Sequence, residues 1–190
     1  TSSMFGNKGY GFKVNITNTF AMFGDLLHHS YIFESIGNAV MISAVIIGVL
    51  LILFGKFNSN WKLYAIISLF LVMVPGFSYV YSIAYMLIPL VAFLNEKKTR
   101  KSDYIYLLLF ILQFGLFIAK KDELFSQFEG SELALNITTL IESVVLLLMM
   151  AMLYLDGIIT TFKSYKGKKI LHIPAKAVAS VAMAGIVFVC

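Results

Sequence analysis

Long runs without a charged residue constrain this chain more than any other feature of its sequence. Residues 36–55, 63–94, 104–119 and 177–190 contain no Asp, Glu, Lys or Arg, and residues 133–155 contain only Glu142. The charged residues are gathered in short islands between these runs. A water-soluble chain of 190 residues needs a more charged surface than 13% charged residues provide, and the mean hydropathy is +0.86. The sequence therefore predicts an integral membrane protein without a soluble domain.

Positive charge is concentrated in two of these islands. Residues 95–102 contain four Lys or Arg, and residues 157–176 contain five Lys. The positive-inside rule places both loops on the cytoplasmic side of the cell membrane and the more acidic residues 120–132 outside. The net charge of +5 then belongs to loops beside anionic lipid, so we expect membrane lipids as partners and no nucleic acid.

The run 63–94 is too long for one membrane span. As a single helix it would measure about 48 Å, against a hydrocarbon core of about 30 Å. Pro75 and Gly76 interrupt it, because Pro removes a backbone donor and Gly permits a tight turn. A hairpin at Pro75 puts Lys56 and Lys62 on the cytoplasmic side, whereas one kinked span would put them outside.

The predicted fold class is an all-α polytopic transmembrane helical bundle that includes this Pro-Gly-broken hairpin. About six spans make up its transmembrane region, 36–190: residues 36–55, 61–74, 77–94, 104–119, 133–155 and 176–190.

The two ends of the chain indicate a fragment of a longer protein. Residues 1–35 are predicted to be extracytoplasmic, although the start of the sequence shows no signal peptide or signal anchor that would carry them across the membrane. The last run, 177–190, would span only about 21 Å as a helix. Within the first segment, Asn18 can cap a short helix with Phe20, Phe23 and Leu27 on one face, so this piece is either an interfacial helix or a few packed loop turns.

A polar and aromatic stripe follows the Pro-Gly break. Ser78, Tyr81, Ser82 and Tyr85 recur at spacings of three and four and would share one face of an α-helix. Irregular backbone at membrane depth is tolerated only where protein or a water-filled cavity satisfies its polar groups. The pattern therefore indicates either the wall of a binding cavity or helix packing through hydroxyl groups.

The order of residues here resembles a late-span motif of glycosyltransferase family 87. The motif runs Pro, two residues, Ser, an aromatic, one residue and Tyr, and it opens an apolar span that ends in Pro and Asn. The matching positions are Pro75, Ser78, Tyr79, Tyr81, Pro89 and Asn95. The resemblance covers residues 61–95.

This resemblance implies a glycosyltransferase that moves a mannose-like sugar from a polyprenyl-phosphate donor to an extracytoplasmic glycan or lipid acceptor. In such enzymes the catalytic acid lies in an early extracytoplasmic loop, so no residue of this chain is assigned as catalytic. The substrate-binding residues would be Pro75, Ser78, Tyr79, Tyr81, Ser82 and Tyr85. No cofactor is implied.

Glu142 is a separate candidate, because an ionisable group inside a span is costly to bury. It is either a functional intramembrane polar site or a group that joins two helices by hydrogen bonds. No metal site is expected, since the adjacent His28 and His29 would point about 100° apart on a helix. Two other functions remain open, a fragment of a transporter or flippase and a fragment of a polysaccharide polymerase or ligase.

Overall fold

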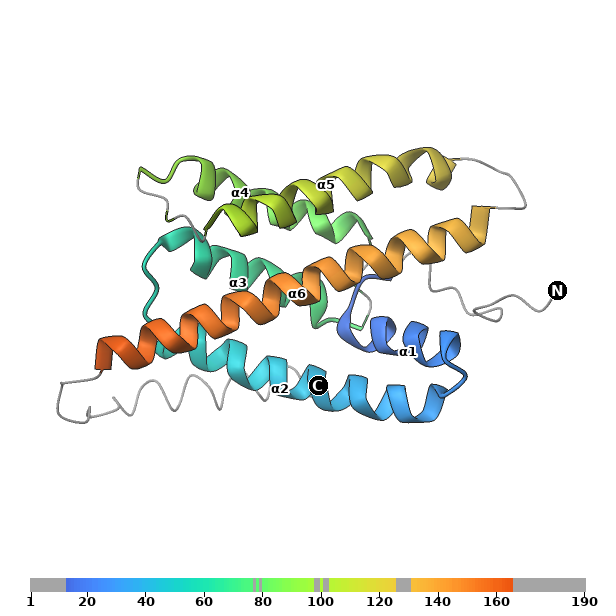
Figure 1. The fold of residues 1–190 in the computed structure, drawn as a ribbon, viewed down its shortest axis with the longest axis horizontal. Coiled ribbons are helices and arrows are strands. Elements are labelled where there is room, and N and C mark those ends of the chain that lie inside the picture. Colours follow the sequence, from blue (N-terminus) through green and yellow to red (C-terminus); the bar gives the residue numbers. More distant parts are fainter. Residues whose placement is uncertain are drawn as a thin grey trace.

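A computed structural model describes residues 13–76, 78, 80–97, 100, 103–125 and 131–165. The regular structure within these residues is helical, which confirms the all-α prediction for them (Figure 1). The elements are α1 (Ile16–Leu26), α2 (Ser30–Phe54), α3 (Asn60–Met73), the 3-10 helix η1 (Val80–Met86), α4 (Leu87–Leu94), α5 (Tyr104–Phe125) and α6 (Ser131–Tyr165). The predicted span 176–190 lies outside the described residues.

Two of the described helices are long and apolar enough to cross a membrane. They are Ser30–Phe54, with a mean hydropathy of 2.6, and Ile137–Ser164, with 2.1. The other apolar stretches, Asn60–Met73, Ser82–Leu94 and Tyr104–Leu116, are shorter. At 1.5 Å per residue, α2 is about 37 Å long and exceeds the hydrocarbon thickness of about 30 Å.

The chain reverses direction between α3 and α4. Trp61, at the start of α3, stacks edge-on against Phe93, at the end of α4, with ring centroids 5.0 Å apart. The two helices therefore run antiparallel (Figure 1). The reversal begins at Pro75, whose carbonyl accepts a hydrogen bond from the Ser78 amide at 3.1 Å.

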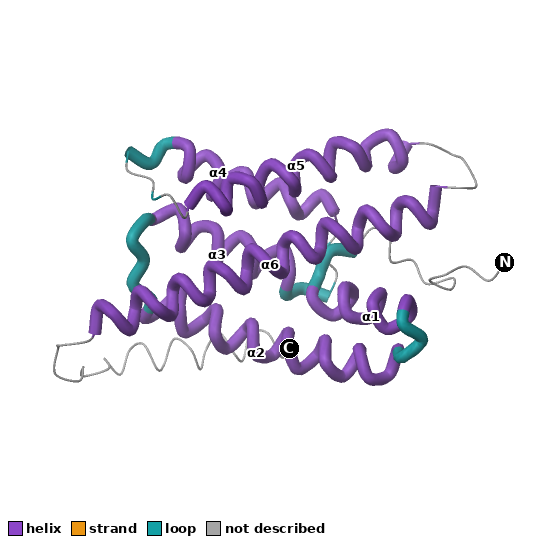
Figure 2. Tube along the Cα trace, viewed as in Figure 1, coloured by secondary structure: helices purple, strands orange, loops and turns teal. Residues whose placement is uncertain are grey.

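The first helix starts earlier than the sequence indicated. Asn15, and not Asn18, is the N-cap of α1, and its Oδ1 accepts the Asn18 amide at 2.8 Å. The predicted cap at Asn18 is wrong because both Asn residues can cap, and Asn15 is also held from outside the helix. After α1 the chain turns through His28, whose φ of 57° is left-handed, and α2 begins at Ser30 (Figure 2).

Two glycines allow α1 and α2 to pack closely. A Cβ on Gly24 would lie 2.8 Å from the Ser30 Cα, and one on Gly37 would lie 2.8 Å from the Phe20 Cβ. The absence of a side chain at both positions lets the backbones of the helical hairpin approach.

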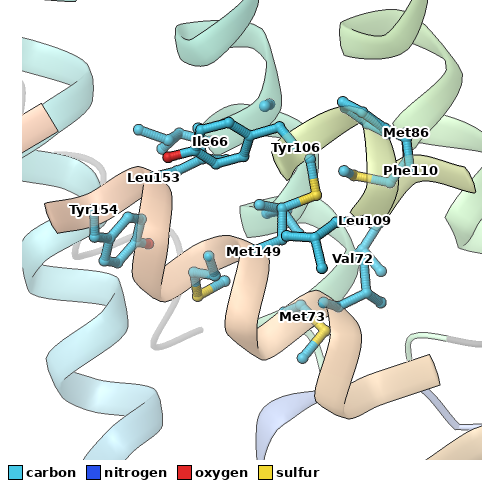
Figure 3. Close-up of a cluster of buried hydrophobic side chains, with 14 of the residues drawn as sticks. Ile66, Val72, Met73, Met86, Tyr106, Leu109, Phe110, Met149, Leu153 and Tyr154 are labelled. Carbon is cyan, nitrogen blue, oxygen red and sulfur yellow. The ribbon is translucent and has the colours of Figure 1, made fainter. Parts of the chain in front are cut away.

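The apolar core lies where α3, α5 and α6 meet (Figure 3). Its side chains recur at spacings of three and four, which places them on one face of each helix. They include Ile66, Val72 and Met73 of α3, Tyr106, Leu109 and Phe110 of α5, and Met149 and Leu153 of α6.

The remaining long helix, α2, joins this core through α6. The Tyr154 hydroxyl of α6 donates to the Ala44 carbonyl of α2 at 2.9 Å. A Cβ on Gly48 would lie only 2.4 Å from that hydroxyl oxygen, so a glycine is required beside it. This contact therefore joins the middle of α2 to the C-terminal half of α6.

Candidate functional site

The interruption after α3 lies inside the bundle and not at its end. Phe70 of α3 lies beside Gly48 of α2, and Thr17 of α1 lies beside Gly37. Because α3 runs antiparallel to α2, Pro75 lies beyond Phe70 on the side of Gly37. Gly37 is seven residues into α2, about 10 Å from its start. The break after α3 thus lies level with an interior part of α2 and not with either of its ends.

At this level the beginning of α1 meets the end of α3. The Asn15 side-chain amide donates to the Gly76 carbonyl at 3.3 Å, and the Val14 amide donates to the Ser78 carbonyl at 3.0 Å. We call these residues, 14–19 with Pro75, Gly76 and Ser78, the helix junction. Asn18 adds a further polar group, since its Nδ2 donates to the Lys13 carbonyl at 2.7 Å. The helix junction is a polar contact between the start of α1 and the break after α3, which are about 60 residues apart in the sequence.

The residues of the predicted polar stripe differ in their exposure. Ser78 precedes η1 and is buried, with no hydrogen-bond partner for its Oγ among the described residues. Ser82 and Pro75 are half-buried, and Tyr85 is 50% exposed. The prediction of one shared α-helical face is wrong, because residues 80–86 form a 3-10 helix whose buried face carries Ile83 and Met86.

The structure does not describe the side chains of two predicted substrate-binding residues, Tyr79 and Tyr81. Tyr81 belongs to η1, but its side chain lies outside the described part of the structure. Tyr79 also lies outside the described residues. The binding role of the whole set stays a prediction.

Glu142 is fully buried on α6, and its neighbours Thr139 and Ser143 are also buried. On α5 the Gln113 side chain is fully buried too, and neither its oxygen nor its nitrogen has a hydrogen-bond partner among the described residues. The buried faces of α5 and α6 therefore carry polar side chains in addition to the apolar core residues.

A charged centre that the sequence did not indicate lies at the other end of α3. The Lys62 ammonium lies 2.8 Å from Asp103 Oδ1 and 2.9 Å from Asp156 Oδ2. Lys62 is 2% exposed, Asp103 is fully buried and Asp156 is 30% exposed. We call these three residues the ion triad. It joins α3, the start of α5 and α6.

Neighbouring groups hold the ion triad in place. The Lys62 ammonium lies 5.3 Å from the ring centroid of Trp61 and 5.4 Å from that of Tyr106, which are cation–π distances. Asp103 Oδ2 accepts the Arg100 amide at 3.0 Å, so the carboxylate also closes the turn before α5. Lys62 is therefore a buried structural cation and not a loop charge of the kind that the positive-inside argument counted.

The signals for the ion triad were present but weak. Asp103 directly precedes the apolar run that begins at Tyr104, which is a favoured place for a helix-capping acid. Asp156 lies just beyond residue 155, where the predicted span ends, whereas α6 continues to Tyr165. A pairing between residues 94 positions apart has no local signature.

No group of three or more His, Cys, Asp or Glu side chains suited to a metal ion is found among the described residues. His28 and His29 occupy the turn between α1 and α2. No protein-family model matches the sequence, and neither a curated protein nor a solved structure matches it. The resemblance of residues 61–95 to glycosyltransferase family 87 therefore stays a prediction.

Proposed function

We propose that this chain is the membrane-embedded part of a glycosyltransferase that uses a polyprenyl-phosphate-linked sugar. The observation that carries the proposal is the helix junction, which puts irregular backbone and the buried Ser78 hydroxyl level with the interior of α2. The Pro-Ser-Tyr order of the resembled family falls on this same segment. The donor's sugar phosphate would bind there, and a glycan or lipid acceptor would meet it from the extracytoplasmic side of the cytoplasmic membrane.

Membrane placement rests on α2 and α6, the two helices that are long and apolar enough to cross a bilayer. In such a setting the interrupted backbone at Pro75 needs polar partners, because lipid supplies none. The Asn15 amide satisfies the Gly76 carbonyl. The Ser78 hydroxyl, which can both donate and accept, has no partner among the described residues and would bind a sugar hydroxyl or a phosphate oxygen.

The test is sugar transfer in vesicles that contain the intact protein and a radiolabelled polyprenyl-phosphate mannose. Ser78→Ala and Tyr81→Phe should each lower transfer while the amount of protein in the membrane stays unchanged. Ser43→Ala is a matched control, because the Ser43 hydroxyl is exposed on α2 and donates only to the Ala39 carbonyl one turn earlier. Wild-type transfer in the Ser78→Ala variant, or an equal loss of protein and activity, would contradict a binding role.

A transporter is the second candidate, and the observation that favours it is the contact between the start of α1 and the break after α3. Broken helices that face one another near the middle of a membrane are a common construction of solute and ion sites in transporters. Glu142, buried on α6, would supply the ionisable group. Loss of uptake of a labelled solute in Glu142→Gln, with sugar transfer absent in wild type, would favour this function over the first.

A further inference from the structure

An apolar groove runs between the C-terminal parts of α2 and α6. None of its lining residues belongs to the helix junction. Its volume is about 350 Å³, within the usual range of about 300–1,000 Å³ for small-molecule sites. The walls are formed by Ile47, Leu50, Leu51, Phe54, Ile158 and Phe162. Leu50 is 49% exposed and Phe162 is 73% exposed, so the groove opens to the surface of the bundle.

Two hydrogen bonds beside the groove are formed within the protein itself. The Gly55 amide donates to the Leu51 carbonyl at 2.9 Å, and the Lys56 amide donates to the Thr161 hydroxyl oxygen at 2.9 Å. The Thr161 hydroxyl oxygen therefore already accepts a hydrogen bond from within the protein. A wall of this kind suits a hydrocarbon chain, because a polar ligand would find few partners on it.

Two exposed lysines are adjacent in the sequence to residues that line the groove. Lys56 follows the lining residue Gly55, and Lys163 follows the lining residue Phe162. The hydrogen bond between the Lys56 amide and Thr161 holds these two chain segments together. Neither ammonium group forms an ion pair with a carboxylate of the described residues, and Asp156 is engaged by Lys62.

An apolar groove beside two exposed lysines, neither of which pairs with a carboxylate of the described residues, matches the chemistry of an anionic phospholipid. We propose that one acyl chain of such a lipid lies in the groove and that its phosphate is bound by Lys56 and Lys163. The proposal rests on the membrane placement of α2 and α6 but not on sugar transfer. Specific binding needs both the acyl chain in the groove and the negative charge of the headgroup, because a lipid without net charge would fill the groove but pair less well with the lysines.

The experiment uses the full chain in nanodiscs of phosphatidylcholine with increasing phosphatidylglycerol. The phosphatidylglycerol carries a photoactivatable group on one acyl chain. After illumination, mass spectrometry should find the label on groove residues such as Leu50 and Phe162. Lys56→Gln together with Lys163→Gln should weaken this labelling about 25-fold, since each basic residue near an anionic surface contributes about fivefold in affinity.

The matched control is Lys97→Gln with Arg100→Gln, which removes the same charge from exposed positions in the α4–α5 connection. It should leave the labelling of Leu50 and Phe162 unchanged. Equal labelling by a phosphatidylcholine probe, or equal loss in both double variants, would overturn the proposal.

A second measurement distinguishes a lipid from the protein's own C-terminal residues as the occupant. Cys190 is the single cysteine of the chain. Efficient disulfide formation between Leu50→Cys and Cys190 in the membrane would show that the chain itself fills the groove and would overturn the lipid site. Failure of the protein to remain in the membrane after alkaline extraction would instead refute the membrane placement on which both proposals rest.

Discussion

Replacing Lys62 by Met should be one of the most damaging single changes in this protein. The substitution removes the cation from between two carboxylates that lie 2.8 and 2.9 Å from it. Asp103, which is fully buried, would then carry an uncompensated charge. Breaking a buried ion pair in this way costs about 3–5 kcal/mol, and the lost cation–π contacts add to that cost.

The two carboxylates should differ in their contributions. Asp103→Asn keeps an oxygen that can accept the Arg100 amide and leaves Lys62 paired with Asp156, so we expect a cost of about 1.5–3 kcal/mol. Asp156 is 30% exposed and its charge is screened by solvent, so Asp156→Asn should cost about 1 kcal/mol or less. The predicted order of destabilisation is Lys62→Met, then Asp103→Asn, then Asp156→Asn.

The assay is reversible unfolding in mixed detergent micelles, followed by the loss of helical circular dichroism. Lys97→Met is the control, because Lys97 is exposed and its replacement should change the free energy of unfolding by no more than about 0.5 kcal/mol. Lys62→Met combined with Asp103→Asn should be more stable than Lys62→Met alone, since no unpaired buried charge remains at Asp103. A Lys62→Met variant as stable as Lys97→Met would refute the buried ion triad.

Three further changes test the close contacts of the fold. Gly48→Ala should lower the unfolding free energy by about 1–3 kcal/mol, because the new Cβ would lie 2.4 Å from the Tyr154 hydroxyl oxygen. Adding Tyr154→Phe should recover part of that loss in the same denaturation assay, and no recovery would place the clash elsewhere. His28→Gly should raise the thermal unfolding temperature, whereas His28→Val should lower it, since φ is 57° at this position. Asn15→Ala should cost about 0.5–2 kcal/mol and increase hydrogen exchange at the start of α1, because it removes the cap and the contact with Gly76; unchanged exchange would argue against the helix junction.

Local patterns in the sequence were sufficient for the helical class and for the interruption at Pro75. Uncharged runs predict helices in a membrane, and Pro followed by Gly predicts a break within one. The structure shows α3 ending at Met73 and an antiparallel return through η1 and α4. Two helices, α2 and α6, meet the length and hydropathy expected of a span, while the remaining predicted spans are not shown as such.

Other features depend on contacts that no short window contains. The stripe from Ser78 to Tyr85 assumed an α-helical period of 3.6 residues, but the segment tightens to three residues per turn, which brings Ile83 and Met86 to the core. The cap of α1 is Asn15 because Gly76, 61 positions away, engages its side chain. The pairing of Lys62 with Asp156 is likewise set by the packing of α3 against α6.

The aromatic cluster beside the ion triad gives the molecule a built-in optical probe. Trp61 is the only tryptophan in the chain, is fully buried and packs against Phe93, Tyr106 and Phe110. Its emission spectrum therefore reports on one place alone, where α3, α4 and α5 converge. A red shift on mild denaturation, before helix content falls, would show that this end of the bundle admits water first. The indole also lies close enough to the Lys62 ammonium for a change in that charge to alter its emission.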